Sequence, residues 1–184
     1  MCLDCKNLLS IKPREFILSG VSVYTATKYS DETSKLLVSL KDKGQFALVE
    51  ELAQMLRSVI ETLPASESIS YLVPAPSSSK NFSKRGFHPM LLLAQAVARK
   101  HPSVSVLNCL RFSRHVKDQV GLTESERIAN LSFSMELNQS VVGRVCYLLD
   151  DVVTTGATAL EAARVLRLGG ATLAGVLAIS YSKG

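Results

Sequence analysis

The clearest hydrophobic pattern in the chain lies in residues 45–63, where apolar side chains recur at the spacing of an α-helix. One face collects Leu48, Leu52, Met55, Leu56, Val59, Ile60 and Leu63. The residues before this segment predict another helix, because Ser30 is a good N-cap and Asp31 and Glu32 give an acidic first turn. That helix is expected to end near Gly44. Two amphipathic helices are therefore predicted in the first third of the chain.

Three further helices are indicated by their ends. Pro89 is a favourable first-turn residue, and the apolar stretch behind it predicts a helix to about residue 100. Thr123 and Glu126 have the spacing of a capping box, which opens a short helix. A last helix over 158–168 is expected to stop at Gly169.

Short apolar runs between the helices predict β-strands. These runs occupy residues 20–29, 69–73, 103–107, 145–149 and 173–179. The last two are continuously apolar, as in strands buried on both faces of a sheet. Loops are expected over 74–86 and 111–121. Because strands and helices alternate in the C-terminal half, the expected fold is α/β, a parallel sheet flanked by helices with right-handed crossovers.

Composition agrees with one well-buried domain. The 184 residues are 47% hydrophobic and contain no Trp. We divide the chain into an N-terminal segment, 1–19, and a domain, 20–184. The net charge of +5 fits nucleic acid and phosphorylated small molecules equally well. The most apolar stretch, 90–98, is too short to span a bilayer, and four cysteines without a secretory signal favour a cytoplasmic protein.

Two adjacent carboxylates, Asp150 and Asp151, follow the apolar run 145–149. A turn of small and hydroxyl-bearing residues comes next and opens a helix: Thr154, Thr155, Gly156, Ala157 and Thr158. Free N–H groups at a helix start favour a phosphate, and paired carboxylates suit sugar hydroxyls or a magnesium ion held through water. The alternative is an Asp that merely caps a turn, which the complete strand–carboxylate–turn–helix series makes the weaker interpretation.

This series resembles the signature for 5-phosphoribosyl-1-pyrophosphate (PRPP) in the type I phosphoribosyltransferases. The resemblance implies that Asp150 and Asp151 are the catalytic carboxylates, which meet the ribose and, indirectly, its Mg²⁺. It assigns the PRPP 5-phosphate to the turn Thr154, Thr155, Gly156, Ala157 and Thr158.

Other segments resemble the ComF family, which is linked to natural competence. Val73-Pro74-Ala75-Pro76-Ser77 and Lys84-Arg85-Gly86-Phe87 are similar to that family's "V-P-x-P … R-G-F-N-Q". Its "R…Q…L…R…N…F" pattern is matched by Arg111, Gln119, Leu122, Arg127, Asn130 and Phe133. The likeness extends from about residue 2 to residue 178. His88 and Pro89 depart from the family, which usually has Asn and Gln there.

The resemblance adds two basic segments to the expected site. Ser77, Lys84 and Arg85 would bind pyrophosphate, the alternative being a solvated basic loop. A flexible loop that closes over the pyrophosphate would carry Arg111, Arg114, Lys117 and Gln119. For Arg114 and Lys117 a surface charge without a role is an equal alternative, and Arg127 would serve equally in a structural ion pair.

Members of the ComF family commonly carry an N-terminal zinc region with several C-x-x-C pairs. Only Cys2-x-x-Cys5 is present here, whereas structural zinc needs four ligands. Cys109 and Cys146 fall in the core pattern. We therefore predict that this chain folds without stoichiometric zinc.

The expected function is binding of PRPP, or transfer of its 5-phosphoribosyl group with release of pyrophosphate, to an acceptor that the sequence does not identify. Mg²⁺ is the expected cofactor. The alternative is a non-catalytic competence module that handles single-stranded DNA during uptake, in contact with the competence machinery. No membrane insertion is expected, and the sequence leaves a homodimer open.

Overall fold

A computed structural model describes residues 11–63, 71–117 and 121–182. Its centre is a six-stranded sheet in the order β1-β2-β8-β7-β3-β4. The bounds are β1 (Arg14–Leu18), β2 (Val21–Lys28), β3 (Tyr71–Pro74), β4 (Ser105–Val106), β7 (Val145–Val153) and β8 (Thr172–Tyr181). β1 pairs antiparallel with β2, and every other pairing is parallel. The predicted α/β fold with a parallel sheet is confirmed.

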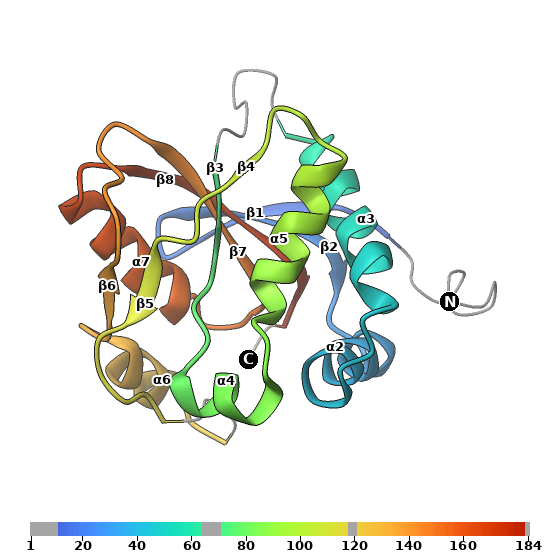
Figure 1. Ribbon diagram of the computed structural model, residues 1–184, viewed down its shortest axis with the longest axis horizontal. Coiled ribbons are helices and arrows are strands. Elements are labelled where there is room, and N and C mark those ends of the chain that lie inside the picture. The colour runs from blue at the N-terminus through green and yellow to red at the C-terminus, as the bar shows by residue number, and fades with distance from the viewer. Residues whose placement is uncertain (1–10, 64–70, 118–120, 183–184) are drawn as a thin grey trace.

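Helices pack on the sheet and at the end where the site lies (Figure 1). They are α2 (Asp31–Lys43), α3 (Leu48–Ile60), α4 (Ser79–Arg85), α5 (Pro89–Arg99), α6 (Glu124–Leu131) and α7 (Ala157–Leu168). α3 packs on α5, and both contact the sheet, whereas α7 contacts β8, α6 and the small antiparallel sheet formed by β5 (Leu110–Phe112) and β6 (Met135–Leu137). Right-handed crossovers in opposite directions put α5 and α7 on opposite faces.

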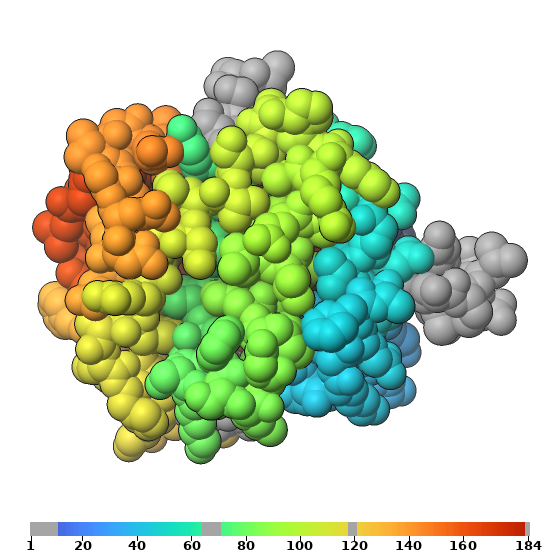
Figure 2. Space-filling view, in the orientation of Figure 1, coloured from blue at the N-terminus to red at the C-terminus, as the bar shows by residue number. Residues whose placement is uncertain are grey.

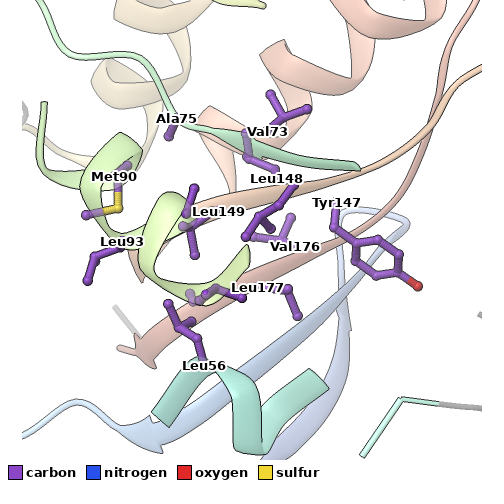
Figure 3. Close-up of a cluster of buried hydrophobic side chains, with 14 of the residues drawn as sticks. Leu56, Val73, Ala75, Met90, Leu93, Tyr147, Leu148, Leu149, Val176 and Leu177 are labelled. Atoms are coloured by element: carbon purple, nitrogen blue, oxygen red, sulfur yellow. The ribbon is translucent and has the colours of Figure 1, made fainter. Parts of the chain in front are cut away.

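One continuous core fills the space between α3, α5 and the sheet (Figure 3). Leu56, Leu93, Leu149 and Leu177 meet there, each with no exposed surface. On the face shown in Figure 2, the segment that carries α4 and α5 lies between α3 and the segment around β5. This packing fixes the carboxyl ends of β3 and β7, from which the site is built.

The helix predictions are close to the structure. Ser30 caps α2, its side chain accepting from the N–H of Thr33, and Gly44 ends that helix in the left-handed region at φ 61°. Thr123 and Glu126 form the predicted capping box at the start of α6. The predicted strand 20–29 is β2, and 173–179 lies within β8.

Several features differ from the sequence interpretation. β5 overlaps the start of the predicted loop 111–121, and β6 was not predicted. β1 lies inside the segment 1–19 and forms a hairpin with β2, so residues 14–18 extend the sheet across the boundary that we placed at residue 20. α4 interrupts the predicted loop 74–86. Its seven residues bury no side chain, so the sequence has no helical pattern of apolar residues there from which the helix could be predicted. β7 continues to Val153, four residues past the predicted end at 149, because the ladder with β8 extends to Tyr181.

In the described part of the chain no helix is long and apolar enough to cross a membrane. Cys109 and Cys146 are both buried and free, as their place in the core pattern predicts. Burial raises the pKa of the Cys109 thiol to about 11. Cys2 and Cys5 lie outside the described residues, so the zinc prediction remains a prediction.

Candidate functional site

The site lies where the order of connections along the sheet reverses. From β3 the chain crosses outward through α5 to β4, and from the neighbouring β7 it crosses the other way through α7 to β8. The loops behind β3 and β7 therefore diverge and leave a crevice at the carboxyl ends of the strands, the usual ligand position in open α/β sheets. A cavity of about 1040 Å³ opens at this point.

Most of the residues singled out in the sequence line this one cavity. They are Ser77, Lys84, Arg85, Lys117, Asp150, Asp151, Thr154, Thr155, Gly156, Ala157 and Thr158. Arg111 and Arg114 line a second hollow of about 500 Å³, which shares Ser77 with the first. Gln119 falls outside the described residues. The fold thus gathers three separate segments of the chain, from β3, from the loop after β5 and from β7, around one space.

Asp150 and Asp151 belong to the last part of β7, and both are partly exposed. The Asp150 carboxylate accepts a hydrogen bond of 2.9 Å from the N–H of Asp151. The Asp151 carboxylate is paired with the ammonium group of Lys41, which comes from the last turn of α2. Lys41 was not among the residues that the sequence suggested, because a lysine in the last turn of a helix is ordinary.

The two carboxyl groups have opposite electrostatic surroundings. Burial, and the negative charge of Asp151 beside it, raise the pKa of Asp150. Burial also acts to raise the pKa of Asp151, but the charge and hydrogen bond of Lys41 outweigh it and the pKa is lowered. Adjacent carboxylates commonly separate in this way. The surroundings therefore favour the negative charge on Asp151 over Asp150.

The turn after β7 leads directly into α7. Gly156 is the N-cap residue, at φ 76°, and as a glycine it has no side chain to cap the helix. The hydroxyl of Thr155 accepts a long hydrogen bond of 3.4 Å from the N–H of Ala157. The start of α7 thus has the geometry expected for an anion-binding turn, with its N–H groups beside the cavity.

Gly156 is also needed for packing. An added Cβ would lie 3.0 Å from Leu18 Cδ2 and 3.3 Å from Leu18 Cγ, so the tip of the β1–β2 hairpin rests against the turn. Both the left-handed φ and this contact exclude a larger residue. The sequence interpretation placed Gly156 only in the turn for the 5-phosphate, because the hairpin contact joins residues that are distant in the chain.

Arg127 of α6 links the loop region to the same turn. Its guanidinium donates hydrogen bonds of 3.0 Å to the hydroxyl of Thr154 and 3.1 Å to the carbonyl of Leu122. The side chain thus bonds to a hydroxyl and a carbonyl, where the sequence had left a structural ion pair open.

The segment 84–87 contacts the end of α2. Arg85 donates hydrogen bonds of 3.1 and 3.3 Å to the Asp42 carboxylate. Phe87 packs edge-on against Phe46, with ring centroids 4.9 Å apart. Lys84 is exposed at the cavity. Arg85 and Phe87 therefore hold α4 against the α2–α3 turn in addition to any part in ligand binding.

His88 is the N-cap of α5. Its Nδ1 accepts a hydrogen bond of 3.2 Å from the N–H of Leu91, and Pro89 takes the first position of the helix. Burial lowers the pKa of His88. Asparagine is also a favoured N-cap residue, so His88 keeps the local capping geometry although it departs from the ComF pattern.

Two arginines of the predicted flexible loop are held by the protein. Arg111 forms an ion pair of 2.8 Å with Glu136 across β5 and β6. Arg114 donates to the carbonyls of Asn130 and Ser132, at 2.9 and 2.8 Å. Arg111 therefore belongs to a paired strand and not to the flexible loop in which the sequence interpretation placed it, because β5 pairs with β6. Arg114 fixes the segment after β5 to the end of α6.

The residues of the site can supply part of the coordination of a magnesium ion. Across the described residues there is no group of three or more His, Cys, Asp or Glu side chains that could hold a metal. Mg²⁺ is usually held by one or two carboxylates, waters and the phosphates of a substrate. Asp150 and Asp151 can supply that carboxylate part.

Comparison with known proteins identifies the family. DNA utilization protein YhgH of Salmonella typhimurium is 30% identical over 174 residues, which cover 92% of this chain and 74% of that protein. The chain belongs to the ComF family. Competence protein F of Haemophilus influenzae is 27% identical over 170 residues, covering 89% of this chain and 72% of that protein. Competence protein ComFC of Bacillus subtilis is 28% identical over 169 residues, covering 90% and 65%.

The chain spans about two thirds to three quarters of the length of these ComF relatives. No protein-family model matches it. Among solved structures, adenine phosphoribosyltransferase from Leishmania donovani aligns with a TM-score of 0.46 and 15% identity, over 95% of this chain and 66% of that one. Orotate phosphoribosyltransferase from Aeropyrum pernix aligns with a TM-score of 0.40 and 16% identity, over 95% and 77%.

Proposed function

We propose that this ComF-family chain binds PRPP at the carboxyl end of β7 and transfers its 5-phosphoribosyl group, with release of pyrophosphate, to an acceptor that is still to be identified. The observation that supports this most is the shared cavity. The acidic pair, the uncapped start of α7 and the basic residues of α4 all line it. Sugar hydroxyls, a phosphate and a pyrophosphate need these three kinds of partner.

Each group has a distinct part in the proposed site. Asp150 and Asp151 accept hydrogen bonds from the vicinal ribose hydroxyls. The hydroxyls and N–H groups of residues 154–158 hold the 5-phosphate, and Ser77, Lys84 and Arg85 face the pyrophosphate. Positive charge near the departing pyrophosphate stabilises the transition state, and the loop around Lys117 excludes water, since hydrolysis competes with transfer. Magnesium bound with PRPP would supply further charge neutralisation at the leaving group.

Calorimetry with PRPP tests this proposal. The wild-type chain should bind PRPP in the presence of Mg²⁺, and the double variant Asp150→Asn/Asp151→Asn should lose affinity by about tenfold or more, because an amide neither stabilises the cation nor accepts as strongly. Glu15→Gln, which neutralises an exposed carboxylate on β1, is the matched control and should bind as the wild type does. Absence of magnesium-dependent PRPP binding at millimolar ligand would refute the proposal.

A second candidate comes from the relatives, two of which are named as competence proteins and one as a DNA utilization protein. In this alternative the exposed lysines of α4 and the loop, Lys80, Lys84 and Lys117, contact the backbone of single-stranded DNA. Competence machinery would then be the partner.

Salt and mutation separate the two functions. DNA affinity should fall in Lys80→Ala/Lys84→Ala and fall steeply with salt, while Asp150→Asn/Asp151→Asn leaves it unchanged or raises it. Arg167→Ala, at the far end of α7, controls for loss of one exposed charge. PRPP binding requires the acidic pair, and backbone-phosphate recognition does not.

A further inference from the structure

The last turn of α2 reaches the acidic pair of the site. Lys41 lies in that turn and lines the cavity, and its ammonium group contacts Oδ2 of Asp151. The side chains are 25% and 17% exposed, so the pair is shielded from bulk water more than an ordinary surface ion pair. Lys41 therefore occupies the position that a cation bound by Asp151 would take.

The next residue of α2, Asp42, forms an ion pair with a cationic group of the site. Asp42 holds the guanidinium of Arg85, the residue expected to face pyrophosphate. The consecutive residues Lys41 and Asp42 thus neutralise one anionic and one cationic group of the site. Phe46 and Phe87 pack together just beyond them and fix the end of α2 against the segment that carries Arg85.

We propose that Lys41 is a positioning residue of this site, the resident counter-ion of Asp151, which a divalent cation must displace before it can reach that carboxylate. The free protein consequently binds a divalent cation weakly. Metal enters with an anionic ligand, whose phosphate oxygens supply the coordination that the chain lacks and attract the released ammonium group. The role of Lys41 as counter-ion stands on the contact with Asp151, and only the identity of the anionic ligand rests on the proposed function.

Manganese binding to the ligand-free chain is the direct test, because Mn²⁺ replaces Mg²⁺ at oxygen sites and its free concentration is measured by electron paramagnetic resonance. Wild type and Lys41→Arg, which keep the positive charge, should bind Mn²⁺ weakly. Lys41→Met and Lys41→Gln should bind it on the order of tenfold more tightly, because one positive charge in contact with the carboxylate is gone. Lys43→Met, an exposed charge on the same helix, should behave as the wild type.

The gain must come from Asp151. Lys41→Met/Asp151→Asn should return to weak Mn²⁺ binding. A merely structural lysine would lower the melting temperature of Lys41→Met and Lys41→Gln and leave Mn²⁺ affinity where it was, and that result overturns the proposal. The glutamine variant retains a hydrogen-bond donor to Asp151, so it gives a folded protein if the methionine variant does not fold.

Adding PRPP separates this inference from the proposed function. A gain of Mn²⁺ affinity in Lys41→Met together with no PRPP binding by the wild type would refute the PRPP proposal and leave the counter-ion role standing. PRPP binding by the wild type with no change of Mn²⁺ affinity in Lys41→Met or Lys41→Gln would refute the counter-ion role and leave the PRPP proposal standing.

Discussion

Replacing Gly156 with alanine should destabilise the protein by about 2–4 kcal/mol, through two separable effects. The left-handed backbone, at φ +76°, costs an L-residue about 1–2 kcal/mol. The new Cβ would lie 3.0 Å from Leu18 Cδ2, closer than side chains normally approach, and this overpacking costs about 1–2 kcal/mol more unless the hairpin tip moves. The prediction thus tests whether the β1–β2 hairpin supports the turn proposed to bind phosphate.

Gly143 provides the matched control. Its φ is +70°, but a Cβ added there meets nothing within 4 Å, so Gly143→Ala should cost only the backbone part, about 1–2 kcal/mol. In a Leu18→Ala background the contact is removed, and Gly156→Ala should then cost about as much as Gly143→Ala. Urea unfolding gives each free energy. Equal costs at Gly156 and Gly143 in the wild-type background, or no relief from Leu18→Ala, would show that the hairpin does not support the turn.

Three other predictions concern the surroundings of the site. Glu161→Gln should cost about 1.5–3 kcal/mol at neutral pH, because this buried carboxylate accepts from the N–H of Met135 and pairs with Arg164. Burial acts to raise the pKa of Glu161, but those partners lower it below 4.5. The contribution of Glu161 to stability is therefore present above pH 4.5 and is lost as the pH falls further. Denaturant unfolding should show the stabilities of the wild type and Glu161→Gln converging in acid. Arg127→Met should speed hydrogen exchange in α6, because the bond to Thr154 is lost, and unchanged exchange would contradict that link. Elemental analysis should find no stoichiometric zinc, and one tightly held zinc per chain would show that ligands were missed.

Most of the helices and strands could be predicted from patterns within a few neighbouring residues. Ser30 and the Thr123 capping box act within one helical turn, and the helix ends that they predict are those of the structure. Elements without a local signal were missed: β1 is largely exposed, and α4 buries nothing, so neither shows the periodicity of a buried face. The extension of β7 beyond residue 149 depends on its pairing with β8, which no local pattern contains.

The same distinction between local and long-range contacts separates the site residues that the sequence suggested from those that it did not. The acidic pair and the turn 154–158 are contiguous in the chain, so the sequence could suggest them together. Lys41 lies 110 positions from Asp151, Arg127 lies 27 from Thr154, and the contact of Leu18 with Gly156 is longer still. Such contacts are consequences of sheet order and helix packing, and a single sequence gives no sign of them.

The position of the acidic pair inside β7 explains why Asp151 is paired with Lys41. Residues of a central strand use their backbone groups in the ladder, and the N–H of Asp151 is further engaged by the Asp150 carboxylate. Two partly buried carboxylates in this setting are costly unless one is protonated or paired. The raised pKa of Asp150 and the contact of Asp151 with Lys41 are those two solutions, applied to neighbouring residues. A diphosphate ligand would add several negative charges beside the pair, in a cavity where Lys41 already neutralises Asp151 and Arg85 is already paired with Asp42. A divalent cation that arrives with the ligand would offset the added charge, as we propose for PRPP and magnesium at this site.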